Sequence, residues 1–164
     1  MATKTLISLE EYLRTSYEHD VDFVEGETIE RGMPSFSHAA AQAQLAYLVK
    51  AGATRPVHVA TELRVRIGAE RIRIVDFCVF VDKPVDVPTQ PPELVVEIVS
   101  PDDRHAVLMQ RLSDFESWGV RHVWLADPQA RQLTRYEQGA LLPATKLEAP
   151  EIGFALTADE LFTD

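Results

Sequence analysis

The chain has 164 residues, which is enough to bury a sizeable core, and its composition is that of an ordinary globular protein. Its net charge of −10 disfavours non-specific binding to duplex nucleic acid, because phosphate contacts need clustered lysine and arginine. A nuclease whose acidic site is neutralised by a cation is not excluded. The single cysteine, Cys78, excludes a disulfide framework. No stretch reads as a signal peptide or a membrane span, so we expect one cytoplasmic domain over residues 1–164.

The first half of the chain is predicted to contain two helices and two strand pairs. The first is a helix over 8–16, followed by strands on either side of a turn at 25–26. The second helix is capped by Ser35 or Ser37 and ends at Gly52. A hairpin of strands over 57–67 and 71–81 follows it. A loop with four prolines follows at 82–92.

The second half begins with an apolar segment over 94–99, which is typical of a central strand covered on both faces. The remaining predictions are a helix that Ser100 opens and that ends at Trp118, strands over 121–126 and 131–136, mostly loop after them, and a helical turn that starts at Thr157. This order predicts an α/β layer fold, in which helices flank a central mixed sheet.

Two acidic residues, Asp76 and Glu97, are each embedded in an apolar predicted strand. Carboxylates are rarely buried unless they are paired or hold a metal. If the two strands are neighbours with these faces aligned, both side chains point into one pocket. That layout is typical of a divalent-metal site, and a carboxylate pair that holds magnesium suits phosphodiester cleavage.

The helix after Glu97 adds a cation to this pair. Arg111 falls within its apolar face, between Phe115 and Trp118, and Arg104 projects close by. A cation buried against the sheet needs an anion, and Glu97 or Asp76 is the candidate. The alternative to a metal site is therefore a buried structural ion pair between these acids and Arg111 or Arg104.

Four arginines alternate along the predicted hairpin and could form a basic face. Because Arg71 and Arg73 point away from Asp76, we interpret the group as a solvated face rather than a phosphate-binding track: Arg64, Arg66, Arg71 and Arg73. The histidines have no zinc spacing. The sequence has no phosphate-binding glycine loop and no nucleophile elbow, which excludes the common nucleotide triphosphatases and serine hydrolases.

Several segments resemble, in order and over nearly the whole chain, the Uma-type putative restriction endonuclease family of the PD-(D/E)XK nuclease superfamily. They are Val21-Asp-Phe-Val-Glu-Gly-Glu27, Ile74-Val-Asp-Phe-Cys-Val-Phe-Val81, Pro92-Glu-Leu-Val-Val-Glu-Ile-Val-Ser-Pro101 and Gly119-Val-Arg-His-Val-Trp-Leu-Ala-Asp-Pro128. The third of these is the most specific. The resemblance implies a restriction-endonuclease-like fold.

The resemblance also implies site residues. Asp76 and Glu97 would be the ligands of a Mg²⁺ or Mn²⁺ ion, with the main-chain carbonyl of Ile98 as a third. Asp22 stands at the amino-terminal acidic position of the family. His38 matches a histidine near the start of the second helix, and we expect it to support the site at most.

The chain departs from the family pattern at the helical lysine, which is replaced by Arg111, and at the acidic position four residues earlier, which is Val107. Val75 stands where proline is usual before Asp76. Arginine cannot act as a general base, but it can orient the attacking water or stabilise charge on the phosphate.

The resulting prediction is a metal-dependent endonuclease that hydrolyses phosphodiester bonds, with DNA as the nucleic-acid partner and Asp76, Glu97, Arg111 and Asp22 as catalytic residues. A homodimer is expected because cutting two strands favours two-fold pairing. The first alternative is a degenerate member that binds nucleic acid or a protein without cleavage, and the second is a hydrolase of another phosphate ester.

Overall fold

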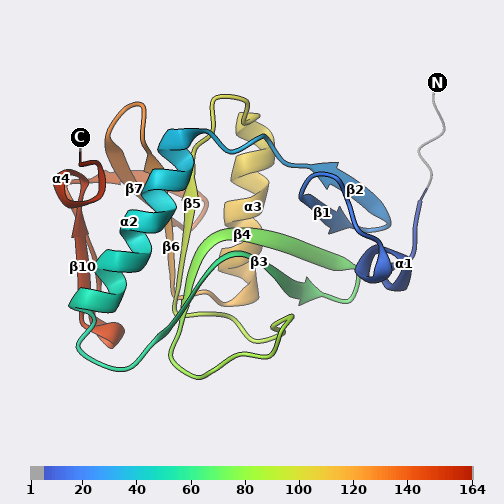
Figure 1. The fold of residues 1–164 in the computed structure, drawn as a ribbon, viewed down its shortest axis with the longest axis horizontal. Coiled ribbons are helices and arrows are strands. Elements are labelled where there is room, and N and C mark those ends of the chain that lie inside the picture. Colours follow the sequence, from blue (N-terminus) through green and yellow to red (C-terminus); the bar gives the residue numbers. More distant parts are fainter. Residues whose placement is uncertain (1–5, 164) are drawn as a thin grey trace.

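The computed structural model describes residues 6–163, and its centre is a sheet of eight strands (Figure 1). The strands run in the order β2-β1-β4-β5-β6-β7-β8, and β3 pairs with β4 alone. Their bounds are β1 Val21–Val24, β2 Glu27–Glu30, β3 His58–Gly68, β4 Arg71–Phe80, β5 Leu94–Ile98, β6 His122–Asp127, β7 Gln132–Glu137 and β8 Ala140–Ala144. Only β5 and β6 pair in parallel among the pairings described for this sheet. The sheet is therefore mixed and mostly antiparallel.

The two long helices cover opposite faces of the sheet. Helix α2, Phe36–Gly52, packs its buried side chains on the face that carries Phe77 and Val96. Helix α3, His105–Trp118, packs on the face that carries Cys78 and Val95. Two short helices, α1 (Leu9–Arg14) and α4 (Ala158–Leu161), complete the described part. The α/β class with flanking helices is thus confirmed.

Most predicted elements have the expected caps. Ser8 accepts a hydrogen bond from the amide of Glu11, and Ser35, not Ser37, caps α2 by accepting from the amide of His38. The turn at Glu25 and Gly26 has positive φ at both residues, and α3 ends where Gly119 adopts φ 106°. No helix among the described residues is long and apolar enough to cross a membrane.

Two sequence predictions about secondary structure are wrong. Helix α3 begins at His105 rather than at Ser100, because residues 100–103 close a turn in which Asp103 accepts from the amide of Ser100 and donates its own amide to the carbonyl of Ser100. The segment after β7 is not mostly loop. It contains β8 and a second sheet of β9 (Lys146–Ala149) and β10 (Phe154–Thr157), separated by a 3₁₀ turn.

Strand β4 changes the face that its residues present as it passes Asp76. Val75 packs in the apolar cluster under α3, although Phe77, two residues later, packs in the cluster under α2. Regular alternation would place both on one side of the sheet. Glu62, on the neighbouring strand between the partners of Phe77 and Val75, has φ 49°. The irregularity lies at Asp76, one of the two acidic residues identified from the sequence.

Candidate metal and catalytic site

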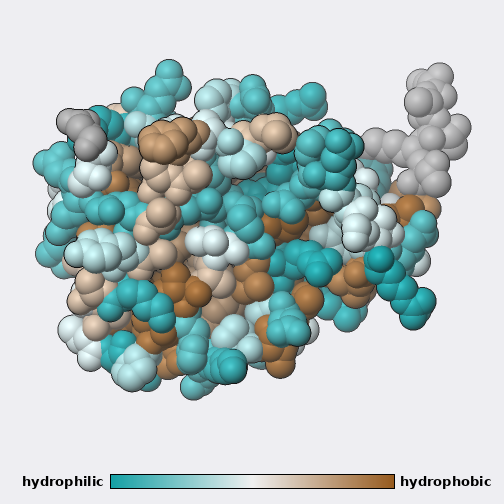
Figure 2. Space-filling view, in the orientation of Figure 1, coloured by the Kyte–Doolittle hydropathy of each residue, from teal (hydrophilic) through white to brown (hydrophobic). Residues whose placement is uncertain are grey.

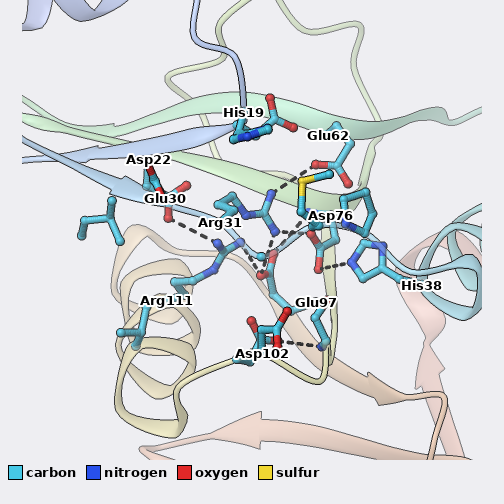
Figure 3. Close-up of a pocket in the computed structure, with 18 of the residues that line it drawn as sticks. His19, Asp22, Glu30, Arg31, His38, Glu62, Asp76, Glu97, Asp102 and Arg111 are labelled. Carbon is cyan, nitrogen blue, oxygen red and sulfur yellow. Dashed lines mark hydrogen bonds and ion pairs between the residues drawn. The ribbon is translucent and has the colours of Figure 1, made fainter.

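Asp76 and Glu97 lie side by side on the adjacent strands β4 and β5, each with only 2% of its surface exposed. The carboxylate of Glu97 accepts from the main-chain amide of Asp76 at 3.2 Å. In return, Oδ2 of Asp76 accepts from the amide of Ile98 at 2.8 Å. These reciprocal bonds fix both carboxylates at the same place between the strands (Figure 3). The predicted meeting of the two acids is therefore present in the fold.

Arg31 places its guanidinium against this pair from the segment that joins β2 to α2. Its Nη2 donates to Oδ1 of Asp76 and lies 4.0 Å from Oε2 of Glu97, and its Nη1 is 3.2 Å from Oε2 of Glu62 (Figure 3). The Arg31 side chain is 13% exposed. Burial lowers the pKa of Arg31, but the surrounding carboxylates outweigh it and raise that pKa above its ordinary value.

Helix α2 contributes two further side chains from its first turns. His38 is buried, and its Nε2 lies 3.3 Å from Oδ2 of Asp76. Gln42 donates to the carbonyl of Asp76 at 2.9 Å and also to the carboxylate of Glu62. His38, which we expect from the sequence to support the site at most, turns its imidazole toward Asp76, while Ser35 caps the helix.

Arg111, from α3, reaches the site from the opposite face of the sheet. Its Nη2 donates to Oε2 of Glu97 and, at 2.7 Å, to the carbonyl of Ile74, while its Nη1 is 3.3 Å from Oδ2 of Asp22. The predicted pairing of Arg111 with an in-strand acid is thus present. Among the described residues, its Nε has no hydrogen-bond partner. Arg104 instead has an exposed side chain at the start of α3.

Asp22 is 1% exposed and joins Arg111 to a second buried arginine. It accepts from the amide of Ile74 at 2.9 Å and from Nη1 of Arg73 at 2.9 Å. Arg73 also donates twice to Asp114, a buried residue of α3. The interpretation of Arg73 as part of a solvated basic face is therefore wrong: its side chain does point away from Asp76, but that face is covered by α3, which supplies the acid.

Burial and neighbouring charges move the two central carboxylates in opposite directions. Burial would raise the pKa of Asp76, but the hydrogen bond from His38 and the charge of Arg31 outweigh it and hold that pKa below its usual range. Burial raises the pKa of Glu97 to about 7, because the nearby Asp76 charge adds to desolvation and Arg111 only partly offsets both. Two neighbouring acids with separated pKa values are typical of functional sites.

The site opens into a cavity of about 880 Å³. Most of the charged side chains along its wall are acidic; beyond the central acids they include Glu18, Asp20, Glu27, Glu30, Asp102 and Asp103. Figure 2 shows a largely hydrophilic face on which apolar side chains form small, separate groups. A negative cavity repels a phosphate diester unless a cation is held in it, so a cation belongs to any chemistry on phosphates here.

Comparison with known proteins gives one family over almost all of the chain. The model of the Uma2 family, described as "Putative restriction endonuclease", matches residues 9–157. The chain belongs to the Uma2 family. A crystal structure of a putative nuclease of DUF820 from Anabaena variabilis has the same fold, with a TM-score of 0.83, 21% sequence identity, and coverage of 96% of this chain and 98% of that one. No curated protein matches the chain.

The residues of this Uma2 chain fit a hard divalent cation. His38, Glu62 and Asp76 each offer one ligand atom, and these atoms all lie within 4.8 Å of one another. Two carboxylates with one imidazole suit Mg²⁺ or Mn²⁺ better than a soft metal. Glu97 lies against Asp76 and can add a further oxygen. The candidate donors thus include His38 and Glu62 in addition to the predicted trio of Asp76, Glu97 and the Ile98 carbonyl.

Sequence reasoning missed two residues of this Uma2 site, Arg31 and Glu62. Arg31 lies outside any helix or strand, so no periodicity marks it. Glu62 reads as an exposed acid in an alternating strand. One signal was available for Glu62: it is the only acidic residue between Val57 and Ile67, and it lies across the predicted hairpin from Asp76.

Proposed function

We propose that this protein is a metal-dependent endonuclease that hydrolyses phosphodiester bonds of DNA. The observation that carries the proposal is the pair of buried carboxylates, Asp76 and Glu97, fixed by reciprocal bonds at the wall of one cavity. Membership of the Uma2 family and the nuclease-like fold support it.

In this proposal, the carboxylates of Asp76 and Glu97 hold a Mg²⁺ or Mn²⁺ ion, with His38, Glu62 and the main-chain carbonyl of Ile98 as further donors. When bound, such an ion supplies Lewis-acid charge for phosphodiester hydrolysis. Arg111 stabilises the negative charge that builds up on the phosphate oxygens, for which its Nε is an unpaired donor among the described residues. Asp22 holds Arg111 in place through its bond to Nη1.

Calorimetric titration with Mn²⁺ tests the ion site first. We expect binding to the wild-type chain and loss of binding when Asp76→Ala and Glu97→Ala are combined. Glu30→Gln is the matched control, because it removes an exposed acid from the wall of the same cavity and should leave the affinity within about twofold. Unchanged binding in the double variant would contradict the assignment.

Cleavage is then assayed on supercoiled and on single-stranded DNA with Mn²⁺ present. We expect cleavage by the wild type and a loss of at least about a hundredfold in Asp76→Ala, because the ion would lose its central ligand. Sedimentation of the same samples tests the proposed homodimer, which would place one site on each strand of a duplex.

A second candidate function is binding without cleavage. It is favoured by Arg111, which stands where the Uma2 resemblance implies a lysine and which cannot take a proton from water. Arg111→Lys separates the two functions. A gain of metal-dependent cleavage only in this variant would identify the natural chain as a degenerate nuclease, whereas equal or reduced cleavage would favour an active enzyme that uses arginine.

A further inference from the structure

The guanidinium of Arg31 is placed among carboxylates as a bound cation would be. It bonds to Asp76, lies 3.2 Å from Glu62 and 4.0 Å from Glu97, and comes from outside the sheet that carries all three acids (Figure 3). Three carboxylates this close repel one another unless a positive charge lies among them. In this structure, Arg31 supplies that charge from the cavity, and Arg111 supplies a second one at Glu97.

Arg31 and a divalent ion need the same oxygen atoms. Asp76 and Glu62 belong to the group whose ligand atoms lie within 4.8 Å of one another, and both are contacted by Arg31. Two cations that share one carboxylate pair at this distance repel each other strongly in a half-buried site. The guanidinium and the ion are therefore alternatives for these oxygens rather than neighbours.

Of the two arginines that contact the central acids, Arg31 is the one whose guanidinium can move away from them. Arg111 is part of helix α3, and its Nη2 is also held by the carbonyl of Ile74 at 2.7 Å. Arg31 follows the end of β2 in a segment without regular structure, and its guanidinium bonds only to carboxylates among the contacts described. Its main-chain amide is held by the carbonyl of Asp20, so the side chain can swing into the cavity while the backbone stays.

We propose that Arg31 is a displaceable counter-cation of the metal site, which the incoming divalent ion must expel from Asp76 and Glu62. The inference rests on the proposed function, since it takes these acids as metal ligands, and it adds a residue to which the proposed function gives no role. It follows that Arg31 lowers the apparent affinity for the ion, because part of the binding free energy is used to break its ion pairs.

Calorimetric titration of Mn²⁺ into chelator-treated wild type, Arg31→Gln and Arg104→Gln tests this inference. Arg104 is the matched control, because it is an exposed arginine on the wall of the same cavity and its loss changes the net charge equally. We expect Arg31→Gln to bind Mn²⁺ about tenfold more tightly than the wild type, and Arg104→Gln to change the affinity by less than about threefold.

Weaker binding in Arg31→Gln, or a gain no larger than that of Arg104→Gln, would overturn the inference while leaving the metal site intact. Absence of binding in all three proteins would overturn the proposed function as well, so the two failures are distinguishable. A crystal structure of the wild type grown with Mn²⁺ decides the question even if Arg31→Gln does not fold: an ion on Asp76 with Arg31 turned away supports displacement, and Arg31 still bonded to Asp76 beside the ion contradicts it.

Discussion

Two groups of arginine and carboxylate side chains meet at the centre of this sheet, and they differ in what surrounds them. The closed group, Asp22, Arg73, Arg111 and Asp114, lies under α3, and each member has 6% or less of its surface exposed. The open group, Arg31, Glu62, Asp76 and Glu97, contacts α2 and lines the cavity, whose wall Asp22 and Arg111 of the closed group also reach. They are joined through the bond between Arg111 and Glu97.

The charges of the closed group stabilise the fold, whereas those of the open group can change partners. In the closed group Asp22 and Asp114 each accept several donors from the protein, and of the group's side-chain nitrogens and oxygens only Nε of Arg111 is without a partner among the described residues. In the open group three acids share the guanidinium of Arg31, and only Glu97 has a second one, that of Arg111, so the negative charge exceeds the positive. A buried pair that is fully bonded specifies structure, whereas a surplus of carboxylates at a cavity attracts a cation.

The largest expected effect comes from breaking the closed group. Asp114→Ala would leave Arg73 buried with only Asp22 as its acidic partner, and Arg71 would lose its buried acid. Removing one partner of a buried ion pair typically costs about 3–5 kcal/mol in the free energy of unfolding. Urea denaturation at neutral pH measures this cost.

The control is the exposed pair of Glu10 and Arg14, whose side chains are 71% and 78% exposed. Arg14→Ala should lower the free energy of unfolding by less than about 1 kcal/mol, because exposed pairs contribute little. Equal losses in both variants would show that burial does not distinguish the closed group from ordinary surface charges.

A smaller effect is expected when Glu97, the residue that joins the two groups, loses its charge. Its pKa is about 7 in the folded chain against an ordinary value of 4.5, so the folded state holds a proton that the unfolded state releases between these values. Stability of the metal-free wild type should therefore fall as pH rises from about 4.5 to 7, by roughly 1–3 kcal/mol. In Glu97→Gln most of this fall should disappear, and Glu62, whose pKa is also raised by burial, accounts for a remaining part.

Thermal melts of both proteins between pH 4.5 and 8 measure the difference. A small decline above pH 6.5 should remain in Glu97→Gln, because the pKa of His38 is also raised by its hydrogen bond to Asp76 despite burial. Asp76, whose pKa is lowered, acts only below about pH 4 and lies outside this window. Parallel pH profiles for the two proteins would mean that Glu97 stays charged throughout.

The smallest expected effect concerns the backbone of the open group. Glu62 adopts φ 49°, which is unfavourable for a residue with a side chain, so Glu62→Gly should relieve about 1 kcal/mol of strain while removing a proposed metal donor. Glu25→Gly is the matched control, since Glu25 has φ 51° at a turn away from the acids. Only Glu62→Gly should weaken Mn²⁺ binding; equal binding in both variants would remove Glu62 from the ion site.

Much of the fold could be predicted because its signals are local. The caps at Ser8 and Thr157 and the left-handed Gly119 each mark a helix end by hydrogen-bond or backbone chemistry within a few residues. The short strands β8 to β10 gave no such signal, since four- or five-residue strands, one of them with Pro143 inside it, lack a readable alternation. Their pairing depends on contacts that only the folded chain makes.

The site also contains residues that the sequence reveals and residues that it does not. Asp76 and Glu97 could be found because a carboxylate in an apolar strand contradicts its surroundings. Arg73 was misread because its burial comes from α3, whose Asp114 lies 41 residues further along the chain. The contribution of Arg31 could not be predicted at all, because its position follows from where the β2–α2 connection passes over the sheet.

The bond between Arg31 and Asp76 also bears on how the protein is made. If a chain depended on a divalent ion to neutralise three adjacent acids, it could not complete its sheet before it had bound that ion. Here the polypeptide carries its own positive charge to the place, so β4 and β5 can pair without an ion. If the proposed ion binds here, folding would come first and metallation would follow.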